Sequence, residues 1–158
     1  MKKIFLLLFV TLGILAQPSS AFELKDFNGA SVNLGDKIGN DKWTLVMFWA
    51  HHCSVCKAEF PTISKLHNNR KDIDVVGISI DGDEGKALAQ AFLDATNPSF
   101  PSYITSLSLT AFNYQALTQE EFRGTPTFLL FTPSGELLGN NPGKLSIESL
   151  ENFIDTNS

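Results

Sequence analysis

The two cysteines of the chain lie three positions apart, directly behind a long apolar run. Residues 43–50 read WTLVMFWA, a run rich in β-forming residues and typical of a strand buried on both faces. Cys53 and Cys56 follow within six residues. Behind them, apolar residues recur at helical spacing, at Phe60, Ile63 and Leu66. The sequence therefore predicts a buried strand, a short loop and a helix that begins at the cysteine pair.

The rest of the chain alternates between strand and helix patterns. Residues 22–34 predict a small hairpin that turns at Asn28-Gly29, and Asp81 lies in a predicted turn where it could cap the following helix. Alternation favours parallel pairing through right-handed crossovers, and a closing hairpin adds antiparallel strands. We therefore expect an α/β fold with a mixed central sheet, helices on both faces and an N-terminal β-hairpin. The further strands are predicted at residues 73–80, 103–104, 127–131 and 136–138, and the further helices at 86–95, 108–117 and 146–154.

The first residues of the 158-residue chain have the pattern of a secretory signal peptide. Lys2 and Lys3 precede an apolar run over residues 4–15, and Ala21 ends a stretch of small residues suited to cleavage. The run is short for a membrane span, which needs about 20 residues, although an uncleaved anchor is the alternative. Cleavage would leave one domain, residues 22–158, and would change the formal net charge from −5 to −7. An acidic chain of this kind disfavours binding to nucleic acid and to anionic lipid.

Three roles are open to a cysteine pair in an exported chain. A structural staple is a poor explanation, because a disulfide that closes a two-residue loop restricts the unfolded chain very little. A redox role fits better, because the amides and dipole of a helix N-terminus stabilise a thiolate at Cys53. Cys53 would attack a partner disulfide, and Cys56, one turn further in, would resolve the mixed disulfide. Metal binding is the third role, because His51 and His52 precede the cysteines and the four side chains together suit copper or zinc.

Four segments together make the chain resemble the thioredoxin superfamily. They are VMFWA, CSVCKAEFP, the intervening DVVGISIDGDEGKALAQAF, and GTPTFLLF further on. The chain is most similar to the exported TlpA/ResA/CcmG branch of thiol–disulfide oxidoreductases. The resemblance implies a thioredoxin-like fold and a periplasmic enzyme that reduces protein disulfides, with apocytochrome c as one possible substrate in cytochrome c biogenesis. It also implies a membrane electron donor of the DsbD/CcdA type, and neither a cofactor nor a metal.

The resemblance assigns roles to particular residues. Cys53 and Cys56 would form the redox-active disulfide, and Glu59 would tune the pair by relaying the proton of Cys56, because Met47 replaces the buried aspartate of plain thioredoxins. The alternative for Glu59 is a solvated helix residue paired with a lysine at position 57 or 65. The bond between Thr125 and Pro126 is expected to be cis, with the backbone of Thr125 offered to the substrate.

Two further residues are expected at the substrate side of the site. Trp49 and His52 are assigned to substrate binding. His52 stands where the family usually has tryptophan, and a protonated imidazole there would favour the Cys53 thiolate and a more oxidising pair. A disulfide-forming oxidant is therefore an alternative function, although the chain has no room for the helical insertion of DsbA-like proteins. A peroxidase is disfavoured, because FWAHHC lacks the threonine and proline expected before a peroxidatic cysteine.

Overall fold

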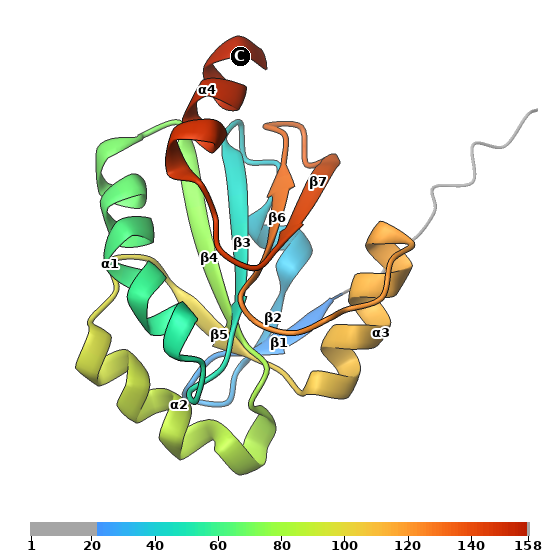
Figure 1. The fold of residues 1–158 in the computed structure, drawn as a ribbon. Coiled ribbons are helices and arrows are strands. Elements are labelled where there is room, and N and C mark those ends of the chain that lie inside the picture. Colours follow the sequence, from blue (N-terminus) through green and yellow to red (C-terminus); the bar gives the residue numbers. More distant parts are fainter. Residues whose placement is uncertain (1–21, 158) are drawn as a thin grey trace, which may run out of the picture.

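The computed structural model describes residues 22–157, so the expected signal peptide lies outside the described residues. Within this range, seven strands form one mixed sheet in the order β2-β1-β5-β4-β3-β6-β7 (Figure 1). The strands are β1 Glu23–Lys25, β2 Ser31–Asn33, β3 Trp43–Trp49, β4 Ile73–Ser79, β5 Ser102–Ile104, β6 Thr127–Phe131 and β7 Leu137–Pro142. The helices are the 3₁₀-helix η1 Leu34–Lys37, α1 Ser54–Asn69, α2 Gly82–Thr96, α3 Leu107–Thr118 and α4 Ile147–Asn157.

Strand β3 is an inner strand of the sheet, and its two neighbours, β4 and β6, run in opposite directions. It runs parallel to β4 from Trp43 opposite Ile73 to Trp49 opposite Ser79, and antiparallel to β6. Every residue of β3 is buried. A central strand covered on both faces needs an apolar residue at nearly every position, which explains the unbroken run in the sequence.

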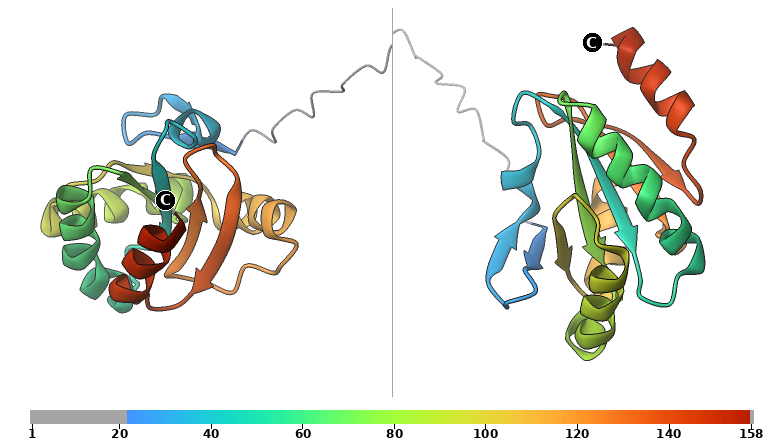
Figure 2. Two further views of the ribbon diagram at one scale, coloured as in Figure 1. Left: turned by 90° about the horizontal axis from the view of Figure 1, so that it is seen from above. Right: turned by 90° about the vertical axis from the view of Figure 1, so that its left-hand side faces the viewer.

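Side chains of β3 alternate between two hydrophobic cores, as the period of a strand requires. Odd-numbered residues such as Leu45 and Met47 face the core beneath α1, α2 and α4. Val46 and Phe48 face a second core, which includes Tyr114 of α3 and Leu34 of η1. Figures 1 and 2 show the three helices on one side of the sheet and α3 on the other.

The observed elements confirm the expected architecture and shift some of its boundaries. The N-terminal hairpin forms β1 and β2, and Gly29 takes the positive φ of 96° that the turn needs. Helix α2 begins at Gly82 rather than at residue 86, and β7 extends to Pro142. In the described part of the chain, no helix combines the length and the apolar composition that crossing a membrane would require.

Candidate active site

The cysteine pair lies at the start of α1, directly after the short loop that joins β3 to this helix. Cys53 is the N-cap of α1, and it forms a disulfide with Cys56 across a Cα–Cα distance of 5.2 Å. The backbone N–H of Cys56 donates to the Cys53 sulfur at 3.0 Å. Cys53 is partly exposed, whereas Cys56 is fully buried. A partner can therefore reach Cys53 first, and after reduction the same N–H would stabilise its thiolate.

Glu59 lies one helical turn beyond Cys56 and is buried, with only 6% of the residue exposed. Its Oε2 accepts a hydrogen bond from the backbone N–H of Leu145 at 3.1 Å. None of the ion pairs among residues 22–157 includes Glu59. The alternative of a solvated glutamate paired with a neighbouring lysine is therefore wrong. The carboxyl group is held in the protein interior, on the face of α1 that carries the buried cysteine.

The bond between Thr125 and Pro126 is cis, as the family resemblance implied. In the antiparallel register, Thr127 lies opposite Phe48, so Pro126 comes next, beside the last residue of β3. The loop before β6 is thus at the same edge of the sheet as the loop that carries Cys53. Thr125 is partly exposed there, while Pro126 is buried. The substrate contact that the family resemblance assigned to the backbone of Thr125 stays a prediction.

The assignment of Trp49 to substrate binding is wrong, because its side chain has no exposed surface. The indole stacks on Phe92 at a centroid distance of 4.9 Å and meets the edge of Phe60 at 5.4 Å. Trp49 is the last residue of β3 and falls on the face covered by α1 and α2, so it completes the core beneath the disulfide. The exposed apolar side chain next to the cysteines is Val55, with 46% of the residue exposed.

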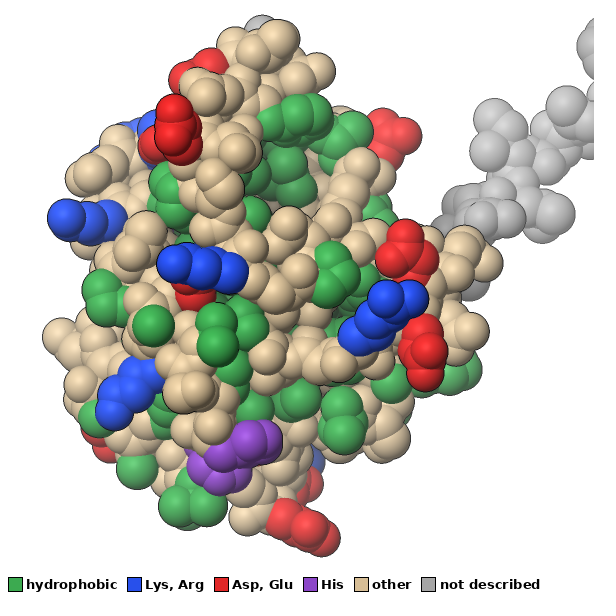
Figure 3. Space-filling view, viewed as in Figure 1, with side chains coloured by type: hydrophobic (Ala, Val, Ile, Leu, Met, Phe, Trp, Pro, Cys, Tyr) green, Lys and Arg blue, Asp and Glu red, His purple; other side chains and the backbone are tan. Residues whose placement is uncertain are grey.

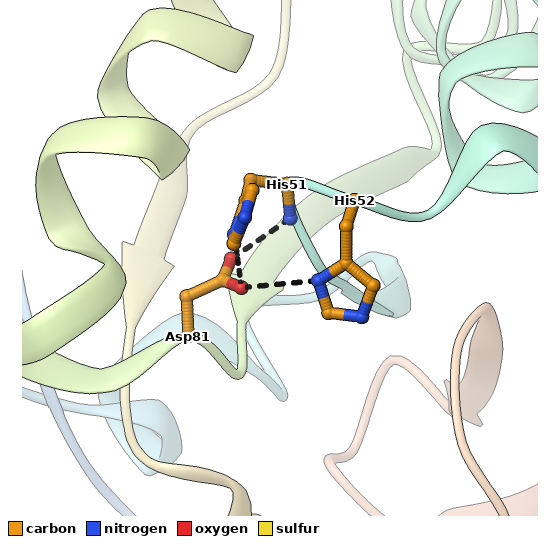
Figure 4. Close-up of side chains that lie close together, drawn as sticks. All are labelled: His51, His52 and Asp81. Atoms are coloured by element: carbon orange, nitrogen blue, oxygen red, sulfur yellow. Dashed lines mark hydrogen bonds and ion pairs between the residues drawn. The ribbon is translucent and has the colours of Figure 1, made fainter.

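An aspartate that the sequence analysis placed elsewhere belongs to this site. Asp81 was expected to cap α2, but its carboxylate makes no capping bond to that helix. Its Oδ2 accepts from the backbone N–H of His51 at 2.9 Å and from the hydroxyl of Ser79 at 2.6 Å. Its Oδ1 lies 2.7 Å from Nδ1 of His51 (Figure 4). The carboxylate therefore fastens the loop after β3 to the loop after β4.

The predicted parallel pairing of the strands before Cys53 and before Asp81 would have been enough to place Asp81 near the cysteine loop. Trp49 and Ser79 are opposite each other at the carboxyl ends of two adjacent parallel strands. Residues that follow such strands meet at one edge of the sheet, which is where functional groups gather in α/β folds. His52, by contrast, keeps a 74% exposed side chain, with its Nδ1 4.0 Å from Oδ1 of Asp81. The assignment of His52 to substrate binding stays a prediction.

Comparison with known proteins places these features in a family. The sequence model of the AhpC/TSA family matches residues 15–138. The thiol–disulfide oxidoreductase ResA of Halalkalibacterium halodurans is 27% identical over 134 residues, which cover 85% of this chain and 72% of that protein. ResA of Bacillus subtilis is 24% identical over 134 residues, or 85% and 70% of the two chains.

Solved structures show the same fold. A secreted disulfide oxidoreductase of Mycobacterium tuberculosis, described as homologous to DsbE of E. coli, matches with a TM-score of 0.66 and 22% identity over 86% of this chain and 96% of that one. A DsbE-like thiol:disulfide interchange protein of Chlorobium tepidum matches with a TM-score of 0.69 and 24% identity, over 86% and 92%. The expected thioredoxin-like fold and the expected enzyme class, thiol–disulfide exchange, are both confirmed.

Proposed function

This chain belongs to the AhpC/TSA family of thioredoxin-like proteins, and we propose that within it the enzyme reduces protein disulfides outside the cytoplasm. The observation that carries the proposal is the Cys53–Cys56 disulfide at the start of α1, with one sulfur within reach of a partner and the other buried. That asymmetry supports Cys53 as the attacking cysteine and Cys56 as the one that completes the cycle.

The first step uses the reduced protein. The Cys53 thiolate attacks one sulfur of the substrate disulfide, forms a mixed disulfide, and releases the other substrate sulfur as a thiolate. The N-terminal amides of α1, including the N–H of Cys56 that points at the sulfur, stabilise the attacking anion. Thr125 is partly exposed at this end of the sheet, and its backbone would offer hydrogen bonds to the substrate chain.

The second step returns the protein to the disulfide seen in the structure. The thiol of Cys56 gives its proton to the buried carboxylate of Glu59, and the resulting thiolate attacks the Cys53 sulfur. This attack forms the Cys53–Cys56 bond and expels the second substrate sulfur as a thiolate. Two electrons have then passed from the enzyme to the substrate. A basic group is needed near Cys56 because burial disfavours the thiolate.

The proposal also includes the compartment of the protein and the source of the electrons that it passes to its substrates. Residues 1–21 act as a signal peptide and residues 22–158 as the thioredoxin-like domain of a periplasmic protein. A membrane donor of the DsbD/CcdA type restores the dithiol, because an oxidising compartment has no thiol pool to do so. The proposed substrates are exported proteins that contain disulfides, apocytochrome c among them. The alternative of a metal-transfer protein using His51, His52 and both cysteines requires the dithiol form, because the disulfide removes two of those four ligands.

Two measurements test the proposal. Cys53→Ser should abolish the reduction of insulin, whereas Cys56→Ser should accumulate a mixed disulfide with the substrate. Equal insulin reduction by Cys53→Ser and the wild type would disprove the mechanism. The equilibrium reduction potential decides the direction: a value near ~−270 mV fits a reductant, and one near ~−120 mV fits the disulfide-forming alternative.

A further inference from the structure

We propose that His51, His52 and Asp81 form a binding site for a divalent transition-metal ion of the zinc type beside the redox disulfide. Ligand atoms of these three side chains all lie within 4.8 Å of one another (Figure 4). Two imidazole nitrogens and one carboxylate oxygen are a donor set that zinc uses in proteins, with a further position left open. The sequence offered the two cysteines as partners of the histidines, and the structure offers Asp81 instead.

The carboxylate of Asp81 is prepared to bind an ion through one oxygen. Its side chain is only 4% exposed, so it does not exchange freely between rotamers. Oδ2 is held by two donors, the backbone N–H of His51 and the hydroxyl of Ser79. Oδ1 is the oxygen that faces the imidazoles of His51 and His52. Hydrogen bonds that orient a ligating carboxylate are a regular feature of metal sites.

The distances suit an ion after small movements. Zinc binds nitrogen and oxygen at about 2.0–2.2 Å, so neighbouring ligand atoms of a tetrahedral site are about 3.3 Å apart. Oδ1 of Asp81 lies 2.7 Å from Nδ1 of His51 and 4.0 Å from Nδ1 of His52. The short separation lengthens when the ion takes the place of the shared hydrogen. The long one closes when His52 rotates, which its 74% exposed side chain can do freely.

The surroundings favour a cation that arrives from solvent. Histidine side chains are visible on the surface at the foot of the molecule in Figure 3. The hollow next to Asp81 is also lined by Glu84 and by Asp83, which is paired with Lys25, and acidic side chains raise the local concentration of cations. Imidazole nitrogen favours zinc, copper and nickel over magnesium and calcium, which prefer six or more oxygen ligands. The site should therefore discriminate between these two groups of ions.

The test uses the oxidised protein, in which both cysteines are joined and cannot ligate. Calorimetric titration with Zn²⁺ should show one ion bound per chain, and a large excess of Mg²⁺ should not displace it. His52→Ala and Asp81→Asn should each weaken binding at least tenfold, while His67→Ala, a histidine on the far part of α1, should leave it unchanged. His52 is exposed, so its variant retains the fold. In the wild type, substituted Co²⁺ should give the absorption bands of a low-coordinate site.

Two results would overturn the site. One is the absence of stoichiometric Zn²⁺ binding by the oxidised wild type. The other is binding that His52→Ala and Asp81→Asn leave at the wild-type strength, which would mean an adventitious ion elsewhere. Neither result bears on disulfide reduction, since the titration never uses the dithiol form. The metal site and the redox cycle can therefore fail independently.

Discussion

Replacing Glu59 by glutamine separates the chemistry of this buried carboxyl group from its place in the structure. In the proposed cycle, Glu59 accepts the proton of Cys56 only when the mixed disulfide is resolved. A positioned general base typically contributes a factor of about 10²–10⁴ in rate. We therefore expect Glu59→Gln to slow resolution by about a hundredfold or more, and to leave the attack by Cys53 unchanged, because that sulfur is activated by the helix N-terminus.

The expected change in the free energy of unfolding follows from the hydrogen bond between Glu59 and the backbone N–H of Leu145. Glutamine keeps an oxygen that can accept from the backbone N–H of Leu145, now 3.1 Å from Oε2 of Glu59. Exchanging a charged acceptor for a neutral one should cost about 1 kcal/mol at most. Glu59→Ala removes the acceptor, and leaving a buried N–H unsatisfied costs about 1–3 kcal/mol. Chemical denaturation of the two variants therefore gives the structural control for the kinetic result.

Stopped-flow reaction of the reduced protein with an aromatic disulfide such as 5,5′-dithiobis(2-nitrobenzoate) resolves the two steps. Attack by Cys53 releases the first thiolate, and resolution by Cys56 releases the second. Cys56→Ser should show the first phase alone, which calibrates the assignment. In Glu59→Gln only the second phase should be slow. A second phase at the wild-type rate, or an equal slowing of both phases, would refute the role of Glu59 as a proton relay.

Three further predictions follow from the same structure. Gly77→Ala should lower the free energy of unfolding by about 1–3 kcal/mol, because its methyl group would overlap side chains of β3 and β5. Gly139→Ala is the matched control and should change it little, because a methyl group there would meet no atom within 4 Å beyond the adjacent residues. Burial lowers the pKa of His67 below its ordinary value of 6.5, so the unfolded chain takes up a proton at a higher pH than the folded one does. Thermal stability should therefore fall as the pH drops below about 6.5. His67→Gln should reduce this dependence of the melting temperature on pH, and an unchanged dependence would exclude His67 as its cause. His52→Ala, measured with a chelator present, should move the pH profile of Cys53 alkylation to higher pH. An unchanged profile would show that the imidazole of His52 does not stabilise the Cys53 thiolate.

Local sequence patterns were enough to predict the elements and the position of the cysteine pair at the start of a helix. The apolar run of β3 could be read directly, because a central strand buried on both faces admits few polar residues. The order of strands and helices then restricted the topology to a few arrangements. Cys53 and Cys56 are near in sequence, so their geometry follows from the helix that begins between them. The cis bond before Pro126 came from the family resemblance rather than from any local pattern.

Relations between distant segments were decided by the tertiary structure. The backbone partner of Glu59 is Leu145, 86 positions away, and Asp81 meets His51 across a separation of 30. Trp49 ends a strand next to the loop that carries Cys53, yet it lies in the core. Side chains alternate between the two faces of β3, and that of Trp49 falls on the face covered by α1 and α2. A sequence fixes which residues are apolar and how they repeat, since those are properties of short segments. Which side chains face one another depends on how the strands pair and the helices pack, and here that pairing brought an aspartate to two histidines beside the disulfide.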